Sequence, residues 1–199
     1  IMKRVIPYSH QLLKETVQRG DIVVDATIGN GHDTLLLSEL VGETGFVYGF
    51  DIQQAALAQT KARLAAHHQP SRTLILDSHA RLEAHLKPEH AHNIKAAIFN
   101  LGYLPGSDKS IITTPDSTIT AVKTLIDHLT VDGIIILVVY HGHPGGDIER
   151  DTLTTYLSQL DQKSFDVLRY GFINQQNHPP FILAIKKKGS LSNRVGEKF

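Results

Sequence analysis

Val24-Asp-Ala-Thr-Ile-Gly-Asn-Gly-His-Asp-Thr34 is the stretch of sequence that decides the fold. An apolar run at residues 22–25 leads into it and predicts a buried strand, and the apolar face of residues 34–40 behind it predicts a helix. Gly29 and Gly31 let the backbone between them turn tightly and approach a ligand closely. The first turn of a helix has N–H groups without partners inside the helix, and these suit a carboxylate or a phosphate. The stretch therefore predicts a strand–turn–helix unit with a ligand at its turn.

Apolar runs of strand length alternate with helical patterns along the chain. Strands are expected at residues 22–25, 46–50, 73–76, 96–99, 134–140, 165–172 and 180–186. Helices are expected between them, at residues 34–40, 53–67, 80–86, 116–129 and 147–160. This alternation predicts βαβ units and a parallel sheet. Residues 171–180 are too few for a crossover helix, so the last two strands should form an antiparallel hairpin. The predicted fold is a doubly wound, Rossmann-like α/β fold, with a seven-stranded, mostly parallel sheet and an antiparallel last strand.

Composition limits the class of protein. The 199 residues are 41% hydrophobic and 20% charged, which is ordinary for a globular protein. We expect one domain at 1–188 and a disordered polar tail at 189–199. No apolar run reaches the roughly 18 residues of a membrane span, and a cytoplasmic protein is the simplest interpretation. The absence of cysteine excludes disulfides and thiolate zinc sites. A formal net charge of zero implies that any nucleic-acid contact is confined to a patch.

Polar residues end four successive predicted strands. They are Asp25, Asp51, Asp77 and Asn100. Ligands of such sheets bind beyond the carboxyl ends of the strands, so these side chains should line one crevice. Asp51 lies 22 residues after Gly29, where an acid accepts hydrogen bonds from ribose hydroxyls. This arrangement suits NAD or S-adenosylmethionine.

The glycine frame separates these two cofactors. A dinucleotide motif would place a third glycine at Thr34. The frame Asp25-x-Thr27-x-Gly29-x-Gly31 is instead the methyltransferase pattern, with Thr27 where glycine is usual. We therefore predict S-adenosylmethionine. The predicted cofactor-binding residues are Asp25, Thr27, Gly29, Asn30, Gly31, His32, Asp33, Thr34, Asp51, Gln53, Asp77, Ser78, His79, Asn100 and Leu101.

The fourth predicted strand ends in Asn100-Leu-Gly-Tyr103, at the place where methyltransferases of planar amines carry Asn-Pro-Pro-Tyr. The Asn100 oxygen can accept amine hydrogens and align the nitrogen lone pair, and Tyr103 can stack on a base or close the pocket. The amine must be neutral to react, and His141 or His143 could take its proton. The predicted catalytic residues are Asn100, Tyr103 and His141.

A metal site is an alternative interpretation of the histidines. His32, His79, His141 and His143 could converge on an ion in this fold. Methyl transfer needs no metal, and a single His-x-His pair is a weak signal. We therefore predict no metal.

Four segments together resemble a bacterial family. They are the segment Asp25-Ala-Thr-Ile-Gly-Asn-Gly-His-Asp33, the segment Asn100-Leu-Gly-Tyr-Leu-Pro-Gly-Ser-Asp-Lys109, the segment Tyr140-His-Gly-His-Pro144 and the segment Tyr170-Gly-Phe-Ile-Asn-Gln-Gln-Asn-His-Pro-Pro-Phe181. The family was long labelled rRNA methylase and is now associated with tRNA wobble-uridine modification. The resemblance covers about residues 4–187 and implies a class I methyltransferase. It also implies methylation of the 5-aminomethyl group of 2-thiouridine in the tRNA anticodon stem-loop, to 5-methylaminomethyl-2-thiouridine.

An aliphatic amine of this kind is mostly protonated at neutral pH. This favours His141 as the proton acceptor, with Tyr140, His10 and bulk water as alternatives. The segment at residues 4–10 could fold over the cofactor, with Tyr8, Ser9 and His10 lining the site, or Ser9 could simply cap a helix.

RNA contacts are expected near the rim of the crevice. The candidates are Lys109, Arg150, Gln175 and Gln176, with Arg169 and Asn177 beside them. Competing functions are a small-molecule amine methyltransferase and an rRNA methyltransferase, followed by a nicotinamide oxidoreductase and a non-catalytic module that binds S-adenosylmethionine or RNA. The oligomeric state stays open, with a homodimer among the alternatives.

Overall fold

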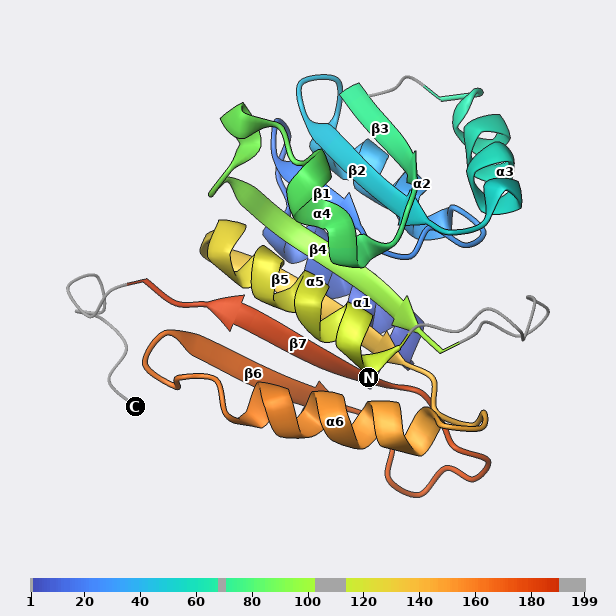
Figure 1. The fold of residues 1–199 in the computed structure, drawn as a ribbon, viewed down its shortest axis with the longest axis vertical. Helices are drawn as coiled ribbons and strands as arrows, with labels where there is room; N and C mark the ends of the chain where they lie inside the picture. Colours follow the sequence, from blue (N-terminus) through green and yellow to red (C-terminus); the bar gives the residue numbers. More distant parts are fainter. Residues whose placement is uncertain (1, 68–70, 103–113, 190–199) are drawn as a thin grey trace.

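The computed structural model describes residues 2–67, 71–102 and 114–189. A seven-stranded sheet in the order β3-β2-β1-β4-β5-β7-β6 forms its centre (Figure 1). The strands are β1 Ile22–Asp25, β2 Phe46–Asp51, β3 Ser71–Leu76, β4 Ile94–Leu101, β5 Leu129–Val139, β6 Phe165–Tyr170 and β7 Phe181–Lys187. The first five run parallel, and β7 lies between β5 and β6, antiparallel to both. The predicted mostly parallel sheet, the hairpin and the antiparallel last strand are confirmed.

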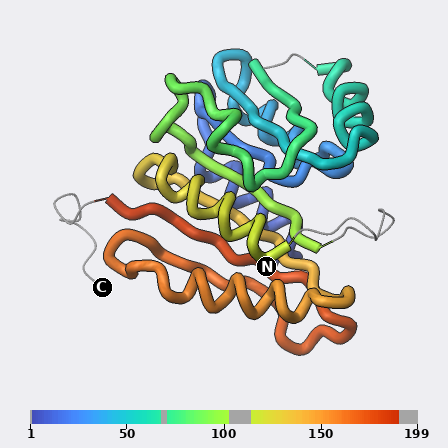
Figure 2. Tube along the Cα trace, in the orientation of Figure 1, coloured from blue at the N-terminus to red at the C-terminus, as the bar shows by residue number. Residues whose placement is uncertain are grey.

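Helices cover both faces of the sheet, as the chain trace also shows (Figure 2). The α-helices are α1 Val5–Thr16, α2 His32–Val41, α3 Gln54–Leu64, α4 Leu82–His85, α5 Pro115–His128 and α6 Gly146–Ser158, with 3₁₀ turns η1 His79–Arg81 and η2 Pro88–His90. Side chains of α4, α5 and α6 pack on one face of the sheet, and those of α1 and α2 pack on the other. In the described ranges no helix is long and apolar enough to cross a bilayer.

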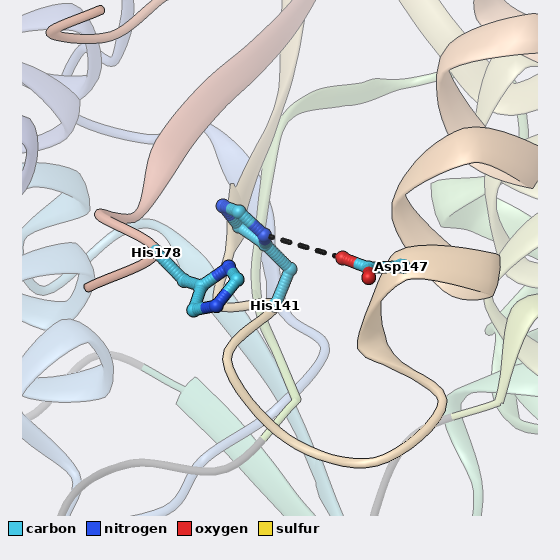
Figure 3. A group of neighbouring side chains, drawn as sticks. All are labelled: His141, Asp147 and His178. Carbon is cyan, nitrogen blue, oxygen red and sulfur yellow. Dashed lines mark ion pairs between the residues drawn. The ribbon is translucent and has the colours of Figure 1, made fainter. Parts of the chain in front are cut away.

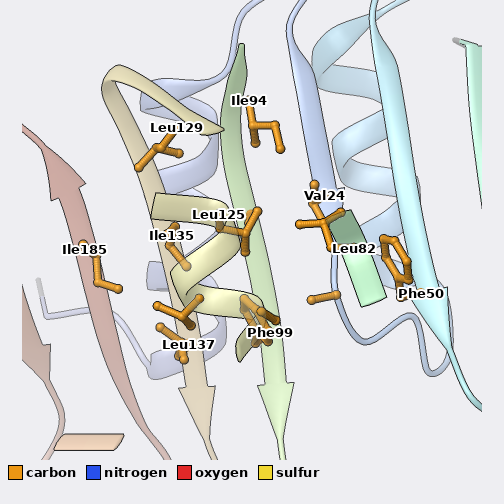
Figure 4. Close-up of a cluster of buried hydrophobic side chains, with 14 of the residues drawn as sticks. Val24, Phe50, Leu82, Ile94, Phe99, Leu125, Leu129, Ile135, Leu137 and Ile185 are labelled. Atoms are coloured by element: carbon orange, nitrogen blue, oxygen red, sulfur yellow. The ribbon is translucent and has the colours of Figure 1, made fainter. Parts of the chain in front are cut away.

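The strands β1, β2, β4, β5 and β7 are apolar on both sides because both faces of the sheet are buried there, whereas the edge strands β3 and β6 are largely exposed. On β1, Val24 packs toward α4 and α5, whereas Val23 packs toward α1 and α2. Figure 4 shows the first of these clusters, which includes Leu125 of α5 and Phe99 of β4. Burying a side chain of this size stabilises the fold by about 2 kcal/mol.

Helix α1 was not among the helices predicted from the sequence. Its buried residues Val5, Ser9 and Leu13 are four apart, so they form one helical face. Ser9 lies inside the helix, where its hydroxyl donates to the Ile6 carbonyl at 2.8 Å, and it does not cap the helix. The polar tail predicted at 189–199 lies outside the described residues from position 190 onward.

The order of the strands indicates which edge of the sheet binds a ligand. From β1 the chain proceeds to β2 and β3 on one side, and β4 then lies against β1 on the other side. The carboxyl ends of β1 and β4 therefore flank the point where the strand order reverses, where ligands of doubly wound sheets bind. Asp25 is paired with Gly49 of β2 and Ile98 of β4, which brings the ends of these three strands together.

Candidate active site

A buried carboxyl group, that of Asp25, forms hydrogen bonds with both ends of the turn that follows β1. Asp25 is completely buried, and its two oxygens accept hydrogen bonds from the Thr27 N–H at 3.2 Å and the Thr34 hydroxyl at 2.6 Å. Burial, with Asp33 and Asp51 as weaker contributors, raises the pKa of Asp25 to about 7. Asp25 and Thr34 were predicted to bind the cofactor directly. The structure places both under the turn, where they hold its two ends together.

Two glycines give the turn its shape. Gly29 and Gly31 have positive φ angles of 53° and 77°, which side-chain-bearing residues rarely adopt. A Cβ added at Gly31 would lie 2.4 Å from the hydroxyl of the buried Thr60 on α3. The Gly29 N–H donates to Asp51 Oδ2 at 2.9 Å, and the Gln53 N–H donates to Asp51 Oδ1 at 2.9 Å. The turn is thus fixed against the end of β2, a contact that the sequence did not predict.

Thr27 links the turn to β4, the strand that carries Asn100. Its hydroxyl oxygen accepts a hydrogen bond from the Asn100 N–H at 2.6 Å. A glycine at position 27 would leave this N–H without its acceptor. The departure from the methyltransferase pattern therefore has a structural reason, because the threonine joins the ends of β1 and β4.

A cavity of about 420 Å³ opens above these strand ends, a size typical of small-molecule sites. Its lining residues are Ile6, His10, Ile28, Asn30, His32, Asp33, Asn100 and Tyr140. Four of the predicted cofactor residues, which are Asn30, His32, Asp33 and Asn100, are thereby brought together. Ile6 and His10 come from α1, so the N-terminal segment does fold over the site. Tyr8 instead stacks on Tyr170 with ring centres 4.0 Å apart.

Asp33 connects two of the lining residues. Its Oδ1 lies 2.7 Å from His10 Nε2, and its Oδ2 accepts a hydrogen bond from Asn100 Nδ2 at 2.7 Å. Because Asn100 uses its amide nitrogen as the donor to Asp33, its side-chain oxygen is the atom left to accept a hydrogen bond from a ligand. The sequence placed Asp33 and Asn100 at the site, but it gave no sign that they contact each other.

The residue that directly follows β4 must be a glycine. Leu101 is fully buried at the end of β4, and it therefore supports the loop from the core. Gly102 has a φ of 92°, and a Cβ there would lie 2.5 Å from the Tyr140 carbonyl oxygen. Tyr103 and Lys109, predicted to be catalytic and RNA-binding, lie outside the described residues.

Three of the predicted cofactor-binding residues follow β3, and the structure engages all three in contacts within the protein. Asp77 accepts hydrogen bonds from His85 Nε2 at 2.8 Å and the Ser78 N–H at 2.8 Å, and the bond from His85 is the main reason that its pKa is lowered. The Ser78 hydroxyl accepts from the Ala80 N–H. His79 is buried, which lowers its pKa, and its Nδ1 lies 3.0 Å from the Ala26 carbonyl. These three residues do not line the cavity.

The structure places His141 away from the cavity. Its Nε2 donates to the Pro179 carbonyl at 3.0 Å, and its Nδ1 lies 3.4 Å from a guanidinium nitrogen of Arg150. Figure 3 shows the ring directed toward Asp147 and His178. Successive residues of an extended segment point to opposite sides, so Tyr140 lines the cavity while His141 does not. His143 is also buried and outside the lining. The predicted role of His141 as proton acceptor therefore lacks a geometric basis.

His141, Asp147 and His178 offer ligand atoms within 4.8 Å of one another, and no other such group of three occurs among the residues that the structure describes. A guanidinium nitrogen of Arg150 lies 3.1 Å from Asp147, so a cation already neutralises this carboxylate. The four histidines of the alternative metal interpretation are not brought together. Among the predicted RNA contacts, Gln175 and Gln176 are exposed in the β6–β7 loop, and Arg150 is also paired with Asp151.

Comparisons with known proteins show which family the chain belongs to. A family model described as "Putative rRNA methylase" matches residues 47–186. A chloroplastic protein of Arabidopsis thaliana named tRNA (mnm(5)s(2)U34)-methyltransferase is 34% identical over 94% of this chain and 70% of its own length. A Clostridium thermocellum structure described by the same words as the family is 42% identical, with a TM-score of 0.89 over 94% of this chain and 99% of the other. A Streptococcus mutans methyltransferase structure in complex with SAH is 40% identical, with a TM-score of 0.84 and the same coverage.

Proposed function

We infer the reaction from the premise that this chain belongs to the family of S-adenosylmethionine-dependent methyltransferases of tRNA wobble uridine, formerly labelled rRNA methylases. The protein is a methyltransferase whose cofactor is S-adenosylmethionine. We propose that it methylates the nitrogen of the 5-aminomethyl group of wobble 2-thiouridine in tRNA. The product is then 5-methylaminomethyl-2-thiouridine.

The charges around the turn fit this cofactor. Asp25, Asp33 and Asp51 are close enough for the latter two to raise the pKa of the first. A carboxylate at the start of α2 repels a pyrophosphate, whereas it attracts a sulfonium or an ammonium group. Asp51 uses one lone pair of each oxygen for backbone N–H groups, and a carboxylate has about four such acceptor sites. Asp51 can therefore also accept hydrogen bonds from the two ribose hydroxyls. A nicotinamide dinucleotide fits this site less well.

The orientation of Asn100 is the single observation that carries the choice of an amine acceptor. When bound, the cofactor supplies a methyl group on a positively charged sulfur. Because Asp33 holds the amide nitrogen of Asn100, the Asn100 oxygen is turned outward to accept an N–H of the amine. Accepting that hydrogen fixes the direction of the nitrogen lone pair, and alignment of reacting groups accounts for a large part of catalysis in general. Asn100 is thus proposed to position the nucleophile.

We propose that the anticodon stem-loop contacts the rim formed by the β6–β7 loop and the start of α6. Gln175 and Gln176 are exposed there and can bond to unstacked bases, and Arg150 can contact a phosphate. Lys109 is proposed as a further contact. RNA contacts confined to this rim agree with a formal net charge of zero.

Methyl transfer from labelled S-adenosylmethionine tests this function. The acceptor is bulk tRNA isolated with its aminomethyl-thiouridine unmethylated, and nucleosides are identified by mass analysis. The control is tRNA that lacks the aminomethyl group. We expect 5-methylaminomethyl-2-thiouridine from the first tRNA and no label in the second. Label in both tRNAs, or in rRNA or small amines alone, would reject the proposed substrate.

A further inference from the structure

The structure assigns a proton acceptor to the cavity: we propose that His10 removes the proton of the substrate ammonium group and that Asp33 positions His10 for this step. The inference rests on the proposed function, because an aliphatic amine must lose a proton before it can attack. His10 is then the catalytic residue on α1, and Asp33 is the positioning residue on α2.

The contact with Asp33 determines which nitrogen of His10 carries the proton. An ionised carboxylate only accepts hydrogen bonds, so His10 Nε2, at 2.7 Å from Asp33 Oδ1, must be the donor. In the neutral imidazole the lone pair then lies on Nδ1. His10 lines the cavity, and its side chain is 28% exposed, so this lone pair is available in a site that a ligand can enter.

The same carboxylate aligns the base with the group that holds the amine. The other oxygen of Asp33 accepts from Asn100 Nδ2 at 2.7 Å. One carboxylate therefore fixes the imidazole on one side and the amide on the other. A single substrate nitrogen can therefore donate one hydrogen bond to the Asn100 oxygen and another to the lone pair of His10 Nδ1.

The other candidates are less suited to the task. Both ring nitrogens of His141 contact groups outside the cavity. Tyr140 lines the cavity, but burial, with Asp33 as a weaker contributor, raises the pKa of its hydroxyl, so it remains protonated and cannot accept the proton. The titratable groups around His10 are Asp33 and His32 of α2 and Tyr140 after β5, with Lys14 one turn further along α1.

The proton and electron balance of the step is simple. The N–H bond of the substrate ammonium breaks, and its proton moves to His10 Nδ1. The neutral nitrogen uses its lone pair for the new C–N bond while the C–S bond of the methyl donor breaks and sulfur keeps the electron pair. The methylated amine leaves as a secondary ammonium ion, and His10 returns its proton to water.

The pH profile of single-turnover methyl transfer to tRNA tests the assignment, with wild type and His10→Gln compared from pH 6 to 9. Glutamine can still donate to Asp33 but cannot accept a proton. We expect the variant to be about 100-fold slower at pH 7, within the range for a general base. The gap should close by about tenfold for each pH unit, because the amine then loses its proton to water. A gap that stays constant with pH, or no gap at all, would overturn the assignment.

A matched control is His128→Gln. His128 forms a similar pair, with Nε2 2.8 Å from Glu83, but it ends α5 at the opposite edge of the sheet. Its rate and pH profile should equal those of wild type. Calorimetric titration with S-adenosylhomocysteine should give the same affinity for wild type and His10→Gln. Lost affinity in His10→Gln would make the residue a cofactor contact and reject the proton role.

A second readout does not depend on activity. Nitrogen-15 NMR of histidine-labelled protein reports which ring nitrogen carries the proton, and His10→Gln identifies the His10 signals among those of the 12 histidines. We expect the Nε2–H form in wild type and the Nδ1–H form in Asp33→Asn, because the amide can present its N–H to Nε2. An unchanged tautomer in Asp33→Asn would reject the positioning role. If wild type itself does not methylate tRNA, the proposed function fails, whereas the tautomer result stands independently.

Discussion

Replacing Asp25 by asparagine should stabilise the protein at alkaline pH. The carboxyl group is fully buried and its pKa is raised to about 7, against 3.8 for the group in an unfolded chain. The folded state therefore binds this proton more tightly than the unfolded state, and the carboxyl group costs more stability as the pH rises from 3.8 to 7. At about 1.36 kcal/mol for each pH unit, the full cost above pH 7 is about 4 kcal/mol.

Asparagine has nearly the same shape but no charge. Its oxygen can accept from the Thr27 N–H, and its amide can donate to the Thr34 hydroxyl, so both contacts of Asp25 can be replaced. The variant should exceed wild type by about 4 kcal/mol at pH 8, and by about 2 kcal/mol at pH 5, where the wild-type carboxyl is mostly protonated. The change in this difference with pH is the signature of the buried charge.

Urea unfolding at pH 5 and pH 8, followed by circular dichroism, measures the two differences. Glu43→Gln is the control, because Glu43 is exposed and its substitution should give a difference near zero at both values. An Asp25→Asn variant whose advantage does not grow from pH 5 to pH 8 would refute the argument that a buried charge at this position costs stability.

Three further predictions concern the cofactor and the turn. Asp51→Ala should weaken S-adenosylhomocysteine binding by about 100-fold in calorimetry, because two hydrogen bonds to a charged group are lost at about 1.5 kcal/mol each; affinity within threefold of wild type would remove the ribose assignment. Asn100→Ala should lower single-turnover methyl transfer by about 100-fold and leave that affinity unchanged, whereas equal losses in both would make Asn100 a cofactor contact. Gly31→Ala should lower the melting temperature far more than Gly145→Ala, since both have positive φ but only Gly31 faces the Thr60 hydroxyl at 2.4 Å; equal losses would show that backbone strain alone decides.

The strands and the functional edge could be predicted because their signals are local. Residues 22–25 form an apolar run that ends in a polar residue, Asp25, and Asp51 and Asn100 repeat that pattern near the ends of later strands. Parallel strands bring such ends to one edge whatever the details of packing. The hairpin of the last two strands followed from the short segment between them. That β7 would lie between β5 and β6 is a matter of tertiary packing, which no local pattern shows.

The contents of the cavity were harder to predict. Helix α1 has no strong start signal, because no side chain caps it and no acid lies in its first turn. The contribution of His10 to the site was therefore only one of several alternatives, and that of Ile6 was not predicted. His141 was favoured because it follows a strand that ends at the correct edge, but the direction of its side chain depends on whether the residue has odd or even position along the segment. A shift of one residue along the segment changes whether a side chain points into the cavity, as that of Tyr140 does, or toward the β6–β7 loop, as that of His141 does.

The position of α1 has a consequence for the order in which the site is completed during folding. Val5 and Leu13 pack in one cluster with Ile136 of β5 and Ile182 of β7, and the Tyr170 hydroxyl donates to the Lys3 carbonyl at 2.6 Å. Part of the packing of α1 therefore comes from strands that lie more than 100 residues later in the chain. Contacts between such distant parts of a chain form slowly. A folding chain can form the turn at Gly29 and Gly31 from neighbouring residues, whereas the packing of α1 beside the cavity is complete only when β5 and β7 have joined the sheet.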